Sequence, residues 1–204
     1  VEAKPTVADV SQTIAPASSQ TFNITGTGFI SIPIVEFIKS DTGAITRAGA
    51  VSFTSSTALS VTTTLATGAY YVRVENNDGN AGRSTNAIIT ASTAPTWSTA
   101  AGSLGSAAGN FSGTVATVAA TSDSAITYSE VSSPAVLIGS GSGQANCTLG
   151  SSSGIIATTD FGGSSTTPTT YTFTLRATDV EGQTADRVFS LTSSFGATGG
   201  GQFN

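Results

Sequence analysis

The side chains that could carry out chemistry are few, because the chain of 204 residues has no histidine and one cysteine, Cys147. Ser-His-Asp and Cys-His catalytic arrangements both require a histidine. The sequence near Cys147 offers no cation that would activate its thiol, and a zinc ion would lack the ligands that it prefers. We therefore predict that Cys147 is a small buried hydrophobe without an intrachain disulfide.

Paired carboxylates are the remaining route to acid–base catalysis. Acidic residues are scattered along the chain, and Asp179 with Glu181 forms the one tight pair of the second half. Both lie in DVEGQT, whose composition is that of a turn, where acidic residues favour the turn and contact solvent. The sequence thus predicts no catalytic residue and no cofactor, in a protein that is not an enzyme.

Oxygen-bearing side chains gather in NNDGN, Asn76–Asn80. Calcium takes about six to eight oxygen ligands, and Asn76, Asn77 and Asp78 supply only a few of them. Asn and Asp tolerate the left-handed backbone region and Gly79 adopts it freely, so this segment favours a hairpin turn. We predict a turn here and no metal site.

The segment NITGTGF, Asn23–Phe29, holds two closely spaced glycines. A phosphate-binding glycine loop runs into a helix whose amides face the anion. Here ISIPIVEF follows instead, with Pro33 and β-branched residues that favour strands. The glycines are therefore predicted to form a bulge or a tight connection between strands.

The composition indicates an all-β protein. Only 9% of the residues are charged, while Ser, Thr, Gly and Ala take the place that Glu, Lys and Leu have in helical proteins. The net charge of -5 leaves no basic stripe for phosphates, which excludes nucleic acid as an expected partner. No apolar run approaches the roughly 18 residues of a membrane helix, so no membrane contact is expected.

Short alternating runs separated by turn residues recur along the chain, as in β-sandwiches. Phe22 and Ile24 share one face of a predicted strand. The clearest run of the first half is AYYVRVEN, in which Tyr70, Val72 and Val74 share one face and Tyr71, Arg73 and Glu75 share the other. The turn at 76–80 is predicted to lead into a last strand around 86–90.

The pattern starts again after ASTAPTW, where Pro95 interrupts any ladder, so a domain boundary is predicted there. The best strand of the second half contains TYTFTLRATD, with inward Tyr171, Phe173 and Leu175. The last strand, ADRVFSLTS, has Val188 next to Phe189, which breaks the alternation. We predict domains at 1–92 and 93–194, the second with six acidic residues against two basic ones, and a glycine-rich tail at 195–204.

Three segments of the first half carry a family resemblance: KPTVADVSQTIAP, FNITGTGF and AYYVRVENNDGNAGRS. Together they resemble the IPT/TIG family of immunoglobulin-like domains. The second half, from PTW to TYTFTLRATDVEGQTADRVFSL, is similar to the cadherin-like or immunoglobulin-like domains of large surface proteins. The tandem, together with the ending SLTSSFGATGGGQFN, resembles structural proteins of marine cyanophages and related tailed phages. This implies two immunoglobulin-like sandwiches in series.

The resemblance also implies a place and partners for the protein. It would be a virion structural protein, as surface decoration, fibre or adhesion module, that contacts other virion proteins in a homo-oligomer or array. The alternative is a secreted bacterial surface adhesin or glycan-binding module with the same architecture, located at the cell surface. Tyr71 and Trp97 are candidates for stacking on a host-surface glycan, although Trp97 is more readily interpreted as packing between the domains. Phe203, after the flexible glycines, is a candidate anchor on a partner chain.

Overall fold

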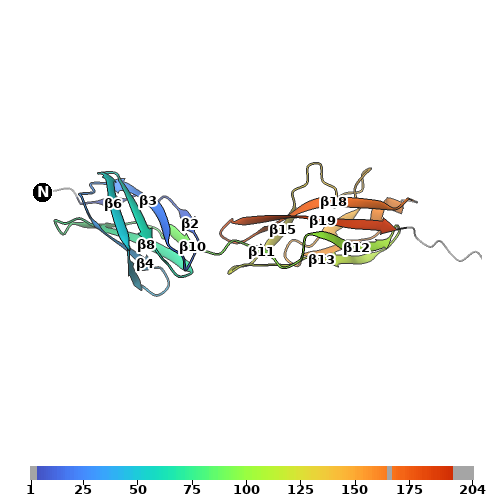
Figure 1. The fold of residues 1–204 in the computed structure, drawn as a ribbon, viewed down its shortest axis with the longest axis horizontal. Coiled ribbons are helices and arrows are strands. Elements are labelled where there is room, and N and C mark those ends of the chain that lie inside the picture. Colours follow the sequence, from blue (N-terminus) through green and yellow to red (C-terminus); the bar gives the residue numbers. More distant parts are fainter. Residues whose placement is uncertain (1–3, 165–166, 195–204) are drawn as a thin grey trace, which may run out of the picture. The chain divides into compact units, whose positions relative to one another are not determined.

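The computed structural model describes residues 4–164 and 167–194, and the chain divides into two compact units, Val1–Thr93 and Ala94–Asn204 (Figure 1). Over the described residues the regular structure consists of strands, with one short 3₁₀ helix, η1 (Phe161–Ser164). Phe203, the candidate partner anchor, lies outside the described residues, as does the rest of the predicted tail.

The described residues of the first unit form ten strands. They are β1 (Thr6–Val7), β2 (Gln12–Ile14), β3 (Gln20–Thr27), β4 (Ile34–Lys39), β5 (Ile45–Arg47), β6 (Ala50–Ser55), β7 (Ala58–Thr63), β8 (Gly68–Glu75), β9 (Ala81–Arg83) and β10 (Ile89–Ala91). One sheet has the order β1-β3-β7-β6 and the other β2-β10-β8-β4-β5, with β9 also paired to β8. The pairs are antiparallel except for β2 and β10, which run parallel.

The core of this unit lies between its two sheets. The predicted inward face of β8 is confirmed, because Tyr70, Val72 and Val74 are buried while the residues between them are partly exposed. From the opposite sheet Ile24, Leu59 and Val61 meet them, with no exposed surface of their own. A two-sheet antiparallel sandwich with this strand order is an immunoglobulin-like fold.

The hairpin after β8 shows why the last strand of this unit differs from its prediction. The turn forms as predicted, with Gly79 at φ 83° and the Asp78 carboxylate accepting hydrogen bonds from Asn80. The chain then pairs at once as β9, and the strand predicted around 86–90 is confined to β10. The cause is Asp9, which accepts hydrogen bonds from the amides of Thr85 and Asn86 and holds that stretch out of the ladder.

The connection predicted for NITGTGF is also present. β3 runs to Thr27, Gly28 follows at φ 69°, and no helix intervenes before β4. Gly26 pairs with Val7 in the neighbouring strand, where an added side chain would collide with the backbone of Thr6. The glycines serve chain pairing and turning, and no phosphate loop is formed.

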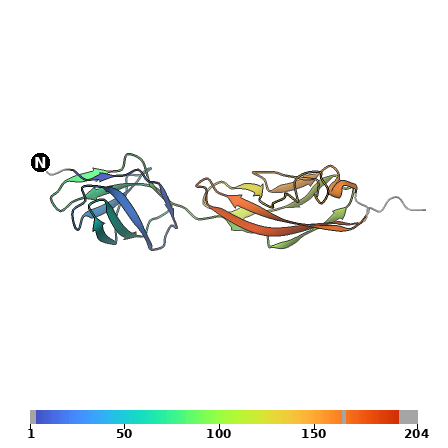
Figure 2. The same cartoon turned by 90° about the horizontal axis from the view of Figure 1, so that it is seen from above.

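The described residues of the second unit form nine strands. They are β11 (Thr96–Trp97), β12 (Gly102–Ala108), β13 (Gly113–Thr117), β14 (Ala120–Thr121), β15 (Thr127–Glu130), β16 (Cys147–Leu149), β17 (Ile155–Thr158), β18 (Thr169–Thr178) and β19 (Thr184–Ser194). The sheets have the orders β12-β19-β18-β15, β13-β17-β16 and β11-β14. Figure 2 shows the long orange and red hairpin of β18 and β19 along one side of this unit.

The core of the second unit is rich in aromatic rings. Tyr171, Phe173 and Leu175 are buried, as predicted for β18, and Phe189 from β19 packs beside them. Ile156 and Cys147 contribute from the facing sheet. This unit is a second immunoglobulin-like sandwich, so the predicted fold class, all-β with two such sandwiches in tandem along the chain, is confirmed.

The break in alternation at Val188 has a simple explanation. Val188 is 51% exposed on the outer face, while Phe189 is fully buried, so the strand alternates regularly and carries an exposed valine. Arg187 faces inward at one end of the strand and donates hydrogen bonds to the carbonyl oxygens of Trp97 and Thr99. Strand β12, which pairs in parallel with β19, was not predicted.

Candidate functional site

A charged row crosses the outer side of the β9-β8-β4-β5 sheet in the first unit. The strand register places Arg47 opposite Glu36, Glu36 opposite Arg73, and Arg73 opposite Arg83. A second row runs beside it, in which Ile38 is paired with Ile45 on one side and with Tyr71 on the other. We call this surface the charged face, and it comprises Glu36, Ile38, Ile45, Arg47, Tyr71, Arg73, Glu75 and Arg83.

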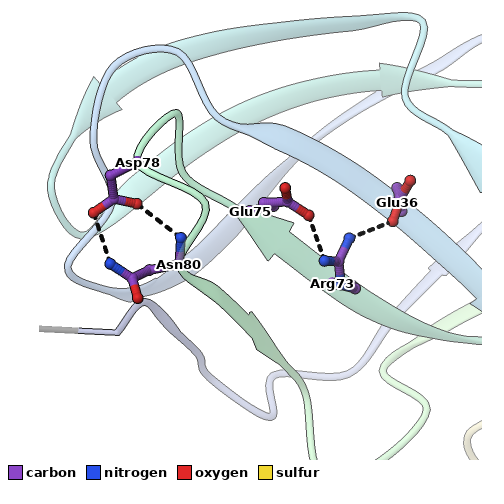
Figure 3. A network of polar contacts seen from close by, with 5 residues as sticks. All are labelled: Glu36, Arg73, Glu75, Asp78 and Asn80. Carbon is purple, nitrogen blue, oxygen red and sulfur yellow. Dashed lines mark hydrogen bonds and ion pairs between the residues drawn. The ribbon is translucent and has the colours of Figure 1, made fainter.

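An ion triplet forms the middle of the charged face (Figure 3). The Arg73 guanidinium donates one hydrogen bond to Glu36, at 2.7 Å, and another to Glu75. The bond to Glu36, and then the bond to Glu75, raise the pKa of Arg73 above its ordinary value. Exposed ion pairs contribute about 0.2–1 kcal/mol each, so the triplet serves chiefly to fix the three side chains in place.

The other two arginines of the face are not neutralised by a carboxylate. Arg83 lies over the ring of Tyr71, 4.4 Å from its centroid, in a cation–π contact. Arg47 is exposed and makes no hydrogen bond or ion pair with any part of the chain that the structure describes. Glu36, which the register places opposite Arg47, is engaged by Arg73 instead. Two guanidiniums are therefore available to a partner.

Apolar surface lies next to these charges. Ile45 is 62% exposed, and the half-buried Ile38 is its neighbour across the sheet. The face has three arginines and two glutamates, hence a charge of about +1 in a chain whose net charge is -5. Such a surface can bind a partner that presents carboxylates around an apolar residue. One side of the Tyr71 ring is covered by Arg83, which blocks sugar stacking there.

Trp97, the candidate for packing between the domains, lies in the core of the second unit. It is 6% exposed, and its ring centroid lies 5.6 Å from that of Tyr128 and 5.2 Å from that of Phe189. Its indole NH donates a hydrogen bond to the Ala185 carbonyl oxygen at 3.0 Å. These contacts all come from its own unit. A further role of Trp97 between the units stays a prediction.

The predicted acidic pair, Asp179 and Glu181, shapes two loops. The buried Asp179 carboxylate accepts hydrogen bonds from the amide and side chain of Gln183, at 2.7 and 3.2 Å. Glu181 accepts one from the Ser124 hydroxyl, at 2.5 Å. Both are turn residues, as predicted, but the expectation that both contact solvent was wrong for Asp179, because the turn folds around its carboxylate.

Cys147 and the NNDGN turn also have structural roles. Cys147 is buried, as predicted, and its burial raises the pKa of the thiol to about 11. The buried Asn76 side chain donates to the Gly28 carbonyl oxygen and accepts from the Ile30 amide, tying the turn to the end of β3. Residues 4–164 and 167–194 hold no group of three or more metal-ligating side chains.

Two contacts in the structure were not predicted from the sequence. The contact between Arg83 and Tyr71 follows from the hairpin register, which pairs Arg73 with Arg83 across the turn and could have been counted out from NNDGN. The Glu130 carboxylate accepts hydrogen bonds from the three consecutive amides of 136–138, at 2.7–2.9 Å. No sequence signal indicates that second contact, because it depends on how an irregular loop folds.

The fold is that of two immunoglobulin-like sandwiches, and the charged face lies on the first of them. No protein-family model matches the chain, and no curated protein does. The described residues include no helix that is long and apolar enough to cross a membrane.

Among solved structures, Drosophila N-cadherin EC1-4 is similar at a TM-score of 0.40 and 14% identity, over 95% of this chain and 51% of that one. A cis-dimer structure of protocadherin gammaB7 is similar at a TM-score of 0.44 and 12% identity, over 94% of this chain and 50% of that one. A three-domain structure of titin is similar at a TM-score of 0.42 and 15% identity, over 93% of this chain and 63% of that one. The chain thus spans about half the length of these cadherin structures. Likeness at this distance does not bear on function, and the fold class rests on the strand order.

Proposed function

We propose that this protein is a non-enzymatic structural module of a phage particle, which acts through protein–protein contacts at the particle surface. The charged face of the first unit makes the contact. The observation that carries the proposal is the pair of arginines, Arg47 and Arg83, left without a carboxylate partner beside exposed apolar surface.

The physical composition of the face supports a role in binding. Arginine and tyrosine are enriched among the residues that dominate the energy of protein interfaces. The ion triplet and the stack of Arg83 on Tyr71 hold these side chains before a partner arrives, which lowers the entropy lost on association. Ile45 adds apolar area that a partner would remove from water.

The location on a phage rests on the sequence resemblance. The segment AYYVRVENNDGNAGRS, which resembles the closing hairpin of IPT/TIG domains, also supplies Tyr71, Arg73, Glu75 and Arg83 of the charged face. We assign residues 1–92 to an IPT/TIG-like domain and 93–194 to a cadherin-like domain on the same resemblance. The remaining residues, 195–204, form the tail whose Phe203 is proposed as an anchor.

Immunogold labelling of purified particles of the encoding phage, with an antibody to this chain, tests the location. Regularly placed label on the particles is expected. Label on bacterial envelopes and none on particles would contradict the phage assignment and favour a secreted adhesin or glycan-binding module.

Variants of the face test the contact. Replacing Arg47 and Arg83 together with alanine should reduce the amount of chain on particles by at least about tenfold, if each arginine contributes roughly 1 kcal/mol. Arg176→Ala is the control, because it removes a surface arginine that already pairs with Asp186. Equal incorporation of the double variant and the control would contradict the role of the charged face.

A further inference from the structure

We propose that the charged face receives the β18–β19 turn of a second copy of this chain, so that copies join head to tail. The inference rests on the proposed contact role of the charged face and names its partner. It follows from the shape, charge and apolar surface of that turn.

The β18–β19 turn presents an apolar side chain beside an acidic one. Val180, the most exposed of the large hydrophobic residues in the described chain at 72%, lies between Asp179 and Glu181. Asp123 is exposed on the neighbouring loop. We call Asp123, Val180 and Glu181 the acidic tip.

Hydrogen bonds hold the acidic tip in shape. The Ser124 hydroxyl donates to Glu181 at 2.5 Å and accepts from the Val180 amide at 3.2 Å, which ties the two loops together. The buried Asp179 carboxylate accepts the Gln183 amide and closes the turn beneath. Val180 is therefore held in an exposed position by its own backbone, although an exposed valine costs solvation free energy. A partner that covers it would recover that cost.

The acidic tip matches the charged face in both charge and polarity. At the tip, Val180 lies next to Glu181, and Asp123 precedes Ser124 on the loop that bonds to both. On the face, Arg47 and Arg83 lie at the two ends of the row beside Ile45 and Ile38. Arg47 and Arg83 are separated by three strand spacings, about 14 Å at the backbone, with Glu36 and Arg73 of the ion triplet between them.

Charge also selects a head-to-tail contact over a symmetric one. If two charged faces met, the unpaired Arg47 and Arg83 of both copies would lie together, and like charges at an interface oppose association. A face and a tip attract each other, and each copy carries one of each. A contact between two different surfaces leaves a free face at one end and a free tip at the other, so association continues into a filament or closes into a ring.

Sedimentation velocity with charge-reversed variants tests the inference. The wild type should associate further as its concentration rises from about 1 µM to about 200 µM, and less at about 500 mM salt than at about 50 mM. Arg47→Glu with Arg83→Glu gives an acidic face, and Asp123→Arg with Glu181→Arg gives a basic tip. Each variant alone should associate at least about tenfold more weakly than the wild type.

Mixing the two variants is the decisive arm. The acidic face then meets the basic tip, and the unchanged face of one variant meets the unchanged tip of the other, so association should return in the mixture alone. Thr21→Glu with Thr25→Glu is the control, because these exposed residues lie on β3 in the opposite sheet and their replacement should leave association unchanged. Circular dichroism melting verifies that each variant folds.

Three outcomes would overturn the inference: a monomeric wild type at every concentration and salt, association that ignores both variants, or loss with the face variant but not with the tip variant. The last would mean that a surface of the second copy other than the acidic tip meets the face. These results leave the proposed function intact as long as the Arg47 and Arg83 alanine variant is still lost from particles. Its normal incorporation would instead contradict the proposed function itself.

Discussion

Strands β8 and β18 pack into the cores of their units in the same way and differ in the residues that they present to solvent. In each strand, buried residues alternate with outward ones. The buried residues are Tyr70, Val72 and Val74 in β8 and Tyr171, Phe173 and Leu175 in β18. The outward residues of β8 are an aromatic ring and charges, and those of β18 are mainly threonines. The inward residues of each strand build the core, and the outward residues differ between the two units.

The charges on the two surfaces are also balanced differently. On β18 and β19, Arg176 forms two hydrogen bonds with Asp186, at 2.7 and 2.8 Å, which lowers the pKa of that carboxyl. The threonines bond to one another, as Thr170 and Thr192 do at 3.0 Å. On the first unit, the triplet around Arg73 is similarly closed, but Arg47 and Arg83 are left over. Unsatisfied charge, rather than charge itself, therefore marks the surface to test for binding.

The largest expected effect comes from the aromatic core of the second unit. Phe173→Ala should lower the free energy of unfolding by about 3–5 kcal/mol, because the buried ring leaves a cavity between the sheets. Calorimetry should show the second unit's transition moving down while the first unit's transition stays. Thr172→Ala, an outward neighbour, should change little. A neutral result for Phe173→Ala would contradict the assigned core.

The matching substitution in the first unit is Leu59→Ala. Leu59 is fully buried on β7, so the expected loss is about 2–5 kcal/mol, and only the first unit's transition should move. Ser60→Ala, on the outer face of the same strand, is its control. If either core substitution shifts both transitions equally, the two units do not unfold independently and the comparison between them fails.

Trp97→Phe should have a smaller effect, about 1–3 kcal/mol, since it removes the indole hydrogen bond to the Ala185 carbonyl oxygen and part of the ring volume. Loss confined to the second unit's transition is expected from the contacts of Trp97. Loss in the first unit as well would instead indicate the predicted packing between the units. Thr96→Ala, an exposed neighbour, controls for changes at the strand itself.

The smallest effect concerns the Cys147 thiol. A pKa raised from 9.0 to about 11 leaves about a hundredfold less thiolate at pH 8, so labelling by a disulfide reagent should be at least that much slower in the native protein than in urea. The native state keeps this proton while the unfolded state loses it. This contribution to stability is therefore full below the unfolded pKa and falls as pH rises toward 11.

Comparing the wild type with Cys147→Ala reports that pH dependence together with that of Tyr171, whose pKa is raised by burial and by the neighbouring Cys147. The wild type should lose stability faster than the variant as pH rises above about 8.5. Fast labelling of the native thiol at pH 8, or parallel pH profiles, would contradict the burial of Cys147.

Much of the fold could be predicted because alternation and turn chemistry are local. The inward set of β8 and the NNDGN turn needed only the sequence of their own segment. Strand β12 has no hydrophobic alternation in GSLGSAA and pairs through long-range contacts with β19, so its sequence carried no signal. Val188 misled for the opposite reason, because an apolar residue on the outer face looks like a break in the pattern.

The candidate site was less predictable than the fold. The outward positions of Tyr71, Arg73 and Glu75 followed from alternation, but which charges neutralise one another depends on strand register. Arg47 lies opposite Glu36 in the ladder, yet Glu36 bonds to Arg73. Which arginine bonds to Glu36 depends on the conformations of the side chains. The burial of Asp179 similarly depends on how its turn closes over the carboxylate.

Hydroxyl-radical footprinting of the chain, free and assembled on particles, tests the central claim most directly, since it measures the solvent exposure of individual side chains. If the charged face makes the contact, Tyr71 and Ile45 should become several-fold less reactive on assembly, while the exposed Ile155 and Val188 of the second unit remain as reactive as before. Unchanged reactivity of Tyr71 and Ile45, with protection of Ile155 or Val188 instead, would show that the contact lies elsewhere and contradict the account.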